Sequence, residues 1–216
     1  MIRRDWLALL ASGAAAFLAL VVVAMHVSQP ELNPADHYVS EYAYGELGWL
    51  VTVGYVAVGL GTLVLAWRLV AILGPARWPL AAAACLALVG VGLIATGMTR
   101  IDLPQSDGSV ISTASGTAHE LAGYVAILGL LPGAFIVSGA FRRDPRLAGA
   151  TGGARLFAWA ILASFAGVIG TQSLDLIGVG QRIFIGSWLA WLFYVGIVLS
   201  GIGATSASQA ADSTPA

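Results

Sequence analysis

The chain has 216 residues, of which 58% are hydrophobic and only 10% are charged, and its mean hydropathy is +0.86. So small a share of charged residues cannot cover a water-soluble globule of this size, and the composition predicts a membrane protein. The formal net charge of −1 gives no sign of a basic face for nucleic acid, and the absence of lysine excludes a Schiff base to retinal or pyridoxal phosphate.

Six apolar runs are long enough to cross a hydrocarbon core of about 30 Å, which takes about 20 helical residues. They predict transmembrane helices over residues 6–26, 49–69, 78–97, 121–141, 156–174 and 183–203. The predicted fold class is therefore all-α, a polytopic bundle of six helices in one transmembrane domain, residues 1–203. Residues 204–216 are small and polar and predict a short disordered cytoplasmic tail.

The arginines divide unevenly between the two ends of the predicted spans. Only Arg100 and Arg182 map to one side, whereas the other side has Arg3, Arg4, Arg68, Arg77, Arg142, Arg143, Arg146 and Arg155. Because positively charged loops stay in the cytoplasm, the arginine-rich side is predicted to be cytoplasmic. We therefore expect a multi-pass protein of the cell membrane with both termini in the cytoplasm.

Most carboxylates map to the opposite, outer side, which has two long loops over residues 27–48 and 98–118. These residues are Glu31, Asp36, Glu41, Glu46, Asp102, Asp107, Glu120 and Asp175. Acidic residues contribute little to membrane topology, so the bias indicates a metal, a cationic substrate or a hydrogen-bonded cap. Long polar connections are also where function tends to lie.

Glutamates precede two of the predicted spans in similar surroundings, Glu46 before the second and Glu120 before the fourth. Each would meet the positive end of a helix dipole. In a sharper interpretation, Glu46, Glu120 and Arg182 converge on one outer cavity. Small-residue pairs such as Gly129 with Gly133 and Ala163 with Gly167 predict close helix packing, and Trp188 is expected to anchor the membrane interface.

Four short motifs flank the spans. They are Asn33-Pro34 with Val39-Ser40-Glu41-Tyr42, Gly97-Met98-Thr99-Arg100-Ile101-Asp102-Leu103-Pro104, His119-Glu120, and Gly180-Gln181-Arg182-Ile183. Together, over roughly residues 7–203, they resemble the bacterial six-helix family catalogued as domain of unknown function 998. A more distant likeness is to the Frag1/DRAM/Sfk1 membrane proteins, whose first outer loop has a similar Ile-Ser-Glu/Asp element.

One element departs from that pattern, because Thr99-Arg100-Ile101 replaces the aromatic-proline pair that usually precedes the family's aspartate. The resemblance implies the six-helix topology and a shared outer polar cluster. It implies no reaction.

Acid–base catalysis on a lipid or small amphiphile is the first functional hypothesis. The candidate catalytic residues are His119, Asp102, Glu120, Ser40 and Glu41, and the candidate substrate-binding residues are Arg182, Glu46, Tyr42 and Asp175. His119 would act as general base, oriented by Asp102 or Glu120, with Ser40 or a water as the nucleophile.

Four alternatives use the same residues differently. A lipid-binding protein or carrier would admit a cation or cationic headgroup to an acidic vestibule, with Arg182 as the counter-ion. A divalent cation would bind to His119, Glu120, Asp102 and Glu41, and a haem would need His26 and His119. A structural cap would use these groups only to pin the outer loops. The expected partners are membrane lipid and a small amphiphile, without nucleic acid, and the sequence assigns no cofactor, metal or oligomeric state.

Overall fold

A computed structural model describes residues 5–105, 107 and 109–212, with side chains up to residue 202. Its six α-helices are α1 (Trp6–Ser28), α2 (Trp49–Leu73), α3 (Arg77–Met98), α4 (Ala114–Arg143), α5 (Thr151–Gln172) and α6 (Ile177–Asp212). Two short 3-10 helices, η1 (Val39–Tyr44) and η2 (Ala148–Ala150), lie in loops. The only β-structure within the described ranges is an isolated bridge between Pro104 and Val110.

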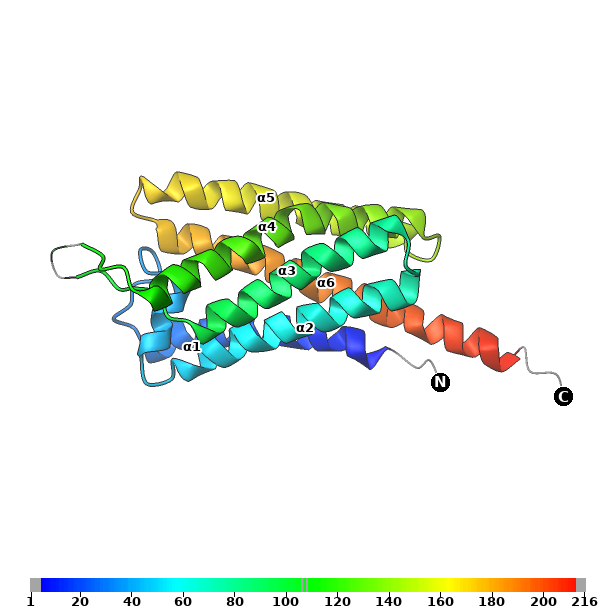
Figure 1. Cartoon of the computed structure of the whole chain (residues 1–216), viewed down its shortest axis with the longest axis horizontal. Coiled ribbons are helices and arrows are strands. Elements are labelled where there is room, and N and C mark those ends of the chain that lie inside the picture. The colour runs from blue at the N-terminus through cyan, green and yellow to red at the C-terminus, as the bar shows by residue number, and fades with distance from the viewer. Residues whose placement is uncertain (1–4, 106, 108, 213–216) are drawn as a thin grey trace.

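All six α-helices are long and apolar enough to cross a membrane, which confirms the predicted all-α, six-span fold class. Each helix packs on the next along the chain, and α6 also packs on α1, so the helices form a closed ring. Because the number of spans is even, α1 begins and α6 ends at the same end of the bundle (Figure 1).

Two helices begin earlier than the hydropathy pattern predicts. Helix α4 begins at Ala114 rather than at residue 121, because the Thr113 hydroxyl accepts a hydrogen bond from Gly116 N at 3.1 Å and caps a polar first turn. Helix α6 begins at Ile177 rather than at residue 183 and continues to Asp212, beyond the predicted end at residue 203. His119, Glu120 and Arg182 consequently lie within helices and not at their starts.

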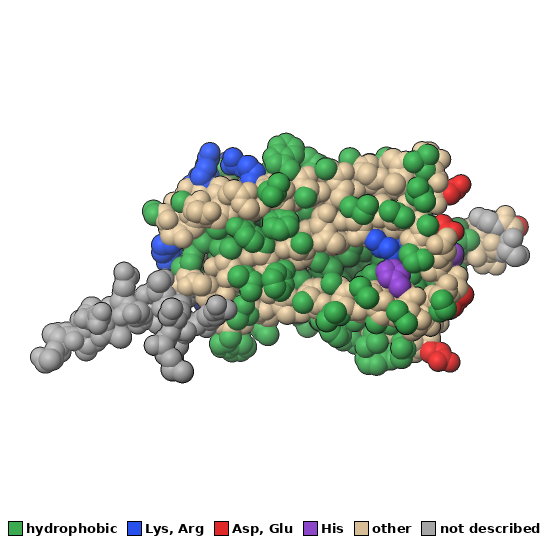
Figure 2. All heavy atoms as spheres, turned by 180° about the vertical axis from the view of Figure 1, so that it is seen from behind, with side chains coloured by type: hydrophobic (Ala, Val, Ile, Leu, Met, Phe, Trp, Pro, Cys, Tyr) green, Lys and Arg blue, Asp and Glu red, His purple; other side chains and the backbone are tan. Residues whose placement is uncertain are grey.

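The charges separate to the two ends of the bundle (Figure 2). One end, here the arginine-rich end, has Arg68 paired with Asp5 and Arg146 paired with Asp144. The other, here the acidic end, has the carboxylates of the two long loops. Arg3 and Arg4 lie outside the described residues.

Helix packing is tightest between α3 and α4 and loosest around α5. A Cβ atom at Gly129 would lie 2.6 Å from the carbonyl oxygen of Cys85, so α3 and α4 approach closely there, as predicted. Gly167 meets nothing within 4 Å, so the predicted packing of Ala163 with Gly167 is wrong within the described chain. Only 17% of the apolar window of α5 is buried, against 56% for α6, so α5 stands at the edge of the bundle.

Candidate functional site

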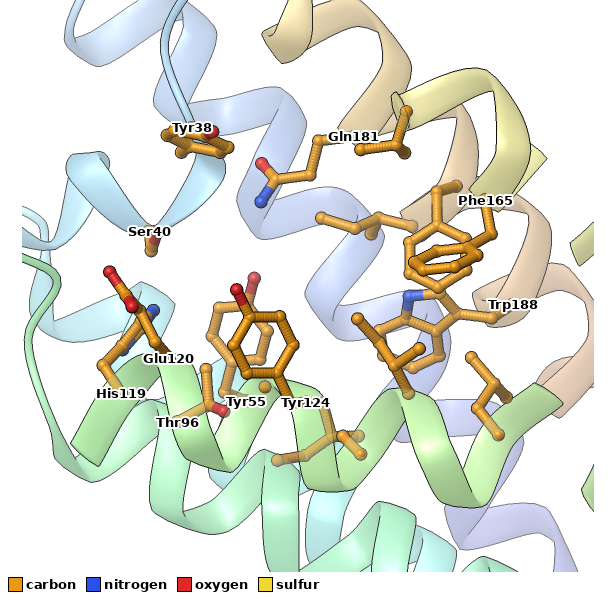
Figure 3. Close-up of a pocket in the computed structure, with 18 of the residues that line it drawn as sticks. Tyr38, Ser40, Tyr55, Thr96, His119, Glu120, Tyr124, Phe165, Gln181 and Trp188 are labelled. Carbon is orange, nitrogen blue, oxygen red and sulfur yellow. The ribbon is translucent and has the colours of Figure 1, made fainter. Parts of the chain in front are cut away.

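A cavity of about 460 Å³ lies between α3, α4, α5 and α6, close to the acidic end. Its polar lining lies near that end and consists of Tyr38, Ser40, Tyr55, Thr96, His119, Glu120, Tyr124, Gln172 and Gln181. Further along the helices the lining is apolar and includes Leu93, Leu130, Phe165, Phe184, Ile185 and Trp188. Figure 3 shows the two regions on opposite sides of the cavity. The cavity therefore has a polar part and an apolar part.

His119 faces this cavity from the second turn of α4 and is 9% exposed. Its Nδ1 lies 3.2 Å from the carbonyl oxygen of Thr99, at the end of α3. Because a carbonyl oxygen only accepts hydrogen bonds, Nδ1 carries a proton and donates it. In the neutral ring, Nε2 is then an acceptor that is available to a group in the cavity.

Ser40 and Glu120 are on the same part of the wall as His119. Ser40 is 6% exposed, whereas Glu120 is exposed at the mouth, and in Figure 3 the Glu120 carboxylate points toward Ser40. No hydrogen bond joins Ser40, His119 or Glu120 to one another, all three of which are described. The structure thus brings three predicted catalytic residues to one wall without linking them into a relay.

Three tyrosines that were not predicted as site residues, Tyr38, Tyr55 and Tyr124, supply much of the remaining polar lining. Tyr38 precedes η1, Tyr55 is on α2, and Tyr124 follows Glu120 by one helical turn on α4. Burial, and after it the charges of Glu41, Tyr124 and Glu120, raise the pKa of Tyr38, so its hydroxyl stays protonated. The spacing of four residues between Glu120 and Tyr124 was the available signal that they share a face.

Thr96 is another lining residue that the sequence did not indicate. Its side chain is 8% exposed, and its Oγ1 has no hydrogen-bond partner among the described residues. Trp188, predicted to anchor the membrane interface, is instead 5% exposed and lines the apolar part of the cavity. Both residues lie inside apolar runs, where the sequence does not distinguish lipid-facing from cavity-facing positions.

Asp102 does not line the cavity and does not contact His119. Its carboxylate accepts hydrogen bonds from the backbone N of Thr113 at 2.8 Å and from the Thr113 hydroxyl at 2.7 Å. Both hydrogen bonds lower the pKa of Asp102, and the bond from the backbone N has the larger effect. The side chain ties the beginning of the second long loop to the start of α4, and the role we predicted for it, orienting His119, has no geometric basis.

Glu41 and Tyr42 hold the first long loop together from within η1. Glu41 Oε1 accepts a hydrogen bond from Tyr38 N at 2.8 Å, which closes a capping box at the start of η1. Tyr42 is fully buried, and its hydroxyl donates to the carbonyl oxygen of Leu32 at 3.3 Å. Neither residue lines the cavity.

Arg182 fixes the same loop against α6. Its guanidinium donates to His26 Nε2 at 2.8 Å, to the Tyr42 hydroxyl at 3.0 Å, and to the carbonyl oxygens of His37 and Gly178 at 2.7 and 3.0 Å. All four acceptors are neutral, since His26 can accept at Nε2 only when that nitrogen is unprotonated.

The remaining predicted binding residues lie elsewhere. Glu46 and Asp175 are exposed at the acidic end, and neither lines the cavity. Asp175 has a positive φ of 54° in the tight connection between α5 and α6. The predicted convergence of Glu46, Glu120 and Arg182 on one cavity is therefore wrong, because only Glu120 reaches it.

No metal or haem site gains support from this arrangement. Among the described side chains, no three His, Cys, Asp or Glu groups are close enough to hold a metal ion. Of the two histidines suggested for haem, His119 lines the cavity, whereas His26 accepts a hydrogen bond from Arg182.

Comparison with known proteins identifies the family of this chain. A family model described as "Protein of unknown function (DUF998)" matches residues 12–198. The chain belongs to this family. No curated protein and no solved structure matches. The description of the family gives no reaction, and the likeness to Frag1/DRAM/Sfk1 proteins stays a prediction.

Asp102→Asn should loosen the second loop without affecting the cavity. The amide retains one acceptor oxygen but cannot accept from both donors of Thr113 as the carboxylate does, so exchange of the Thr113 amide hydrogen should accelerate about fivefold. Asp107→Asn in the same loop is the matched control and should leave Thr113 unchanged.

The pH dependence has a defined sign. The pKa of Asp102 is lower in the folded protein than in the unfolded chain. The hydrogen bonds between Asp102 and Thr113 therefore stabilise the fold fully at a pH above the pKa of the unfolded chain, and this stabilisation is lost as the pH falls through the lower pKa of the folded protein. Hydrogen exchange that is identical in Asp102→Asn and the unmodified protein would contradict this role.

Proposed function

We propose that this multi-pass membrane protein binds a single amphiphile in the cavity between α3, α4, α5 and α6. The observation that carries the proposal is the division of the cavity wall into a polar part near the acidic end and an apolar part further along the helices. A polar headgroup fits beside Ser40, His119 and Glu120, and an apolar chain fits beside Phe165 and Trp188. A volume of about 460 Å³ is in the range of sites for one small molecule.

Lateral entry from the membrane is supported by the exposure of the cavity rim. Tyr124 on α4 and Ile169 on α5 both line the cavity, and each is 61% exposed. The gap between α4 and α5 therefore faces the surroundings of the bundle at its side. An amphiphile dissolved in the lipid has a route through this gap that does not cross water.

We also propose that the protein lies in the cell membrane with its arginine-rich end facing the cytoplasm. The cavity would then open toward the outer leaflet. The excess of arginine at that end supports this orientation. A reporter that is active only in the cytoplasm, fused after Ala216, should be active, and one fused into the loop at Asp107 should be inactive. The reverse pattern would overturn the orientation and leave the cavity itself unaffected.

The binding proposal is tested by quenching of Trp188 fluorescence. A brominated long-chain alcohol added to the protein in phosphatidylcholine nanodiscs should quench saturably, and the saturable component should be lost in Trp188→Phe. Gly123 lines the cavity, and a Cβ there meets nothing within 4 Å, so Gly123→Leu fills the cavity without a backbone clash. It should weaken binding about tenfold.

Gly186→Leu on α6 is the matched control, because a Cβ at Gly186 also meets nothing within 4 Å and Gly186 does not line the cavity. Its affinity should equal that of the unmodified protein. Quenching that rises linearly and equally in the unmodified protein and in Trp188→Phe would mean that the probe only partitions into lipid, and binding in the cavity would be rejected.

A second candidate function is hydrolysis or transfer at the headgroup, with His119 as general base. A hollow of about 10 Å³, the size of one water molecule, lies beside the main cavity and shares Ser40, Tyr55, Thr96 and His119 with it. The orientation of His119 Nε2 away from Thr99 also supports this candidate.

Catalysis and simple binding differ in the effect of His119→Ala. If His119 is the base, turnover of a fluorogenic lipid ester should fall about a hundredfold or more, while saturable quenching of Trp188 is retained. His37→Ala, at a partly exposed histidine outside the cavity, is the control and should keep full turnover. Turnover that is absent in the unmodified protein, or unchanged in His119→Ala, would remove the catalytic candidate.

A further inference from the structure

The charges on the cavity wall restrict the headgroup that the cavity can hold. Glu120 is the one carboxylate on the wall, and the described lining includes no arginine or lysine. An anionic headgroup would meet the charge of Glu120 without any cation beside it. A cationic headgroup would instead form an ion pair with the Glu120 carboxylate.

Tyr38, Tyr55 and Tyr124 present aromatic rings in the same polar part of the cavity. In Figure 3 the hydroxyls of Tyr55 and Tyr124 point in the same direction into the cavity, and Tyr38 lies across the cavity from them. The faces of tyrosine rings attract cations, and this attraction strengthens where water is partly excluded. A carboxylate together with several aromatic rings is a combination suited to an ammonium group.

Thr96 provides an independent sign of a ligand. It is more than nine-tenths buried, it lines the cavity, and its hydroxyl has no partner among the described residues. A buried hydroxyl without a hydrogen bond is costly, and a threonine within a helix ordinarily donates to the carbonyl four residues earlier. A headgroup with polar hydrogens would donate a hydrogen bond to its oxygen.

Arg182 does not line this wall, although its charge acts on Tyr55. It neighbours Gln181 on α6, but its guanidinium is directed to His26, Tyr42 and the carbonyl oxygens of His37 and Gly178, none of which lines the cavity. The acidic end as a whole has eight carboxylates against the two arginines Arg100 and Arg182. This excess produces a negative potential that concentrates cations near the mouth.

We infer that the amphiphile bound in this cavity has a cationic amine headgroup, held by Glu120 and the three tyrosines, with its apolar chain along Phe165 and Trp188. The inference rests on the proposed binding function and specifies its ligand class. Such a headgroup belongs either to a simple long-chain amine or to an aminophospholipid, in which a phosphate lies beside the nitrogen.

The test uses the Trp188 quenching assay with four brominated probes of the same chain length, whose headgroups are a primary ammonium, a sulfate, a hydroxyl and a phosphoethanolamine. The ammonium probe should bind about tenfold more tightly than the hydroxyl probe, and the sulfate probe more weakly than either. A phosphoethanolamine probe that equals the ammonium probe would identify an aminophospholipid as the source of the amine. A weaker one would identify a simple amine.

Glu120→Gln keeps the shape of the side chain and removes its charge. It should lower the affinity for the ammonium probe about tenfold and leave the hydroxyl probe unchanged. Glu46→Gln, at an exposed carboxylate of the same end that does not line the cavity, is the matched control for the general potential and should change neither.

The two proposals fail in different ways. Saturable quenching by all probes with equal affinity, or tightest binding of the sulfate probe, would overturn the cationic headgroup and leave amphiphile binding intact. No saturable quenching by any probe would overturn the binding function itself.

Discussion

Two adjacent side chains of α6 hold the first loop over the bundle, and the polar wall of the cavity depends on them. Gln181 accepts a hydrogen bond from Val39 N at 2.8 Å, and Arg182 donates to the carbonyl oxygen of His37 at 2.7 Å. Residues 37 to 40 therefore alternate between two roles, contact with α6 and lining of the cavity. Residues 37 and 39 are tied to α6 through their backbones, whereas Tyr38 and Ser40 line the cavity. Close to the apolar interior, such hydrogen bonds are costly to leave unmade, so the loop position is well determined.

The excess of carboxylates at the acidic end has more than one physical cause. Asp102 and Glu41 accept hydrogen bonds from backbone N–H groups that would otherwise have no partner near the helix and loop starts. Both are structural, and neither lines the cavity. Glu120 is the one carboxylate that remains on the cavity wall, so the charge that acts on a ligand is much smaller than the acidic composition of the loops suggests.

The fold was predictable because lipid imposes a simple rule, about 20 apolar residues for each span. The starts of α4 and α6 were not. The first turn of α4 is polar and is capped by Thr113, which hydropathy does not detect, and the start of α6 has two glycines followed by Gln181 and Arg182, which lower the local hydropathy. Ser40, His119 and Glu120 were identifiable as polar groups at one end. Tyr55, Thr96 and Trp188 were not, because in a membrane bundle both the lipid-facing and the inward-facing sides of a helix are apolar. The partner of Asp102 also depends on the path of a loop, which sequence spacing does not give.

The surroundings of His119 favour binding over strong base catalysis. In catalytic triads, a carboxylate both orients the histidine and stabilises the positive charge that forms on its ring. Here the carbonyl oxygen of Thr99 orients the ring, but it offers only a dipole to offset that charge. Glu120, the one carboxylate on the cavity wall, makes no hydrogen bond to the ring and is exposed at the mouth. An oriented His119 without a carboxylate partner is therefore better suited to accept a hydrogen bond from a headgroup than to remove a proton from a weakly acidic hydroxyl such as that of Ser40.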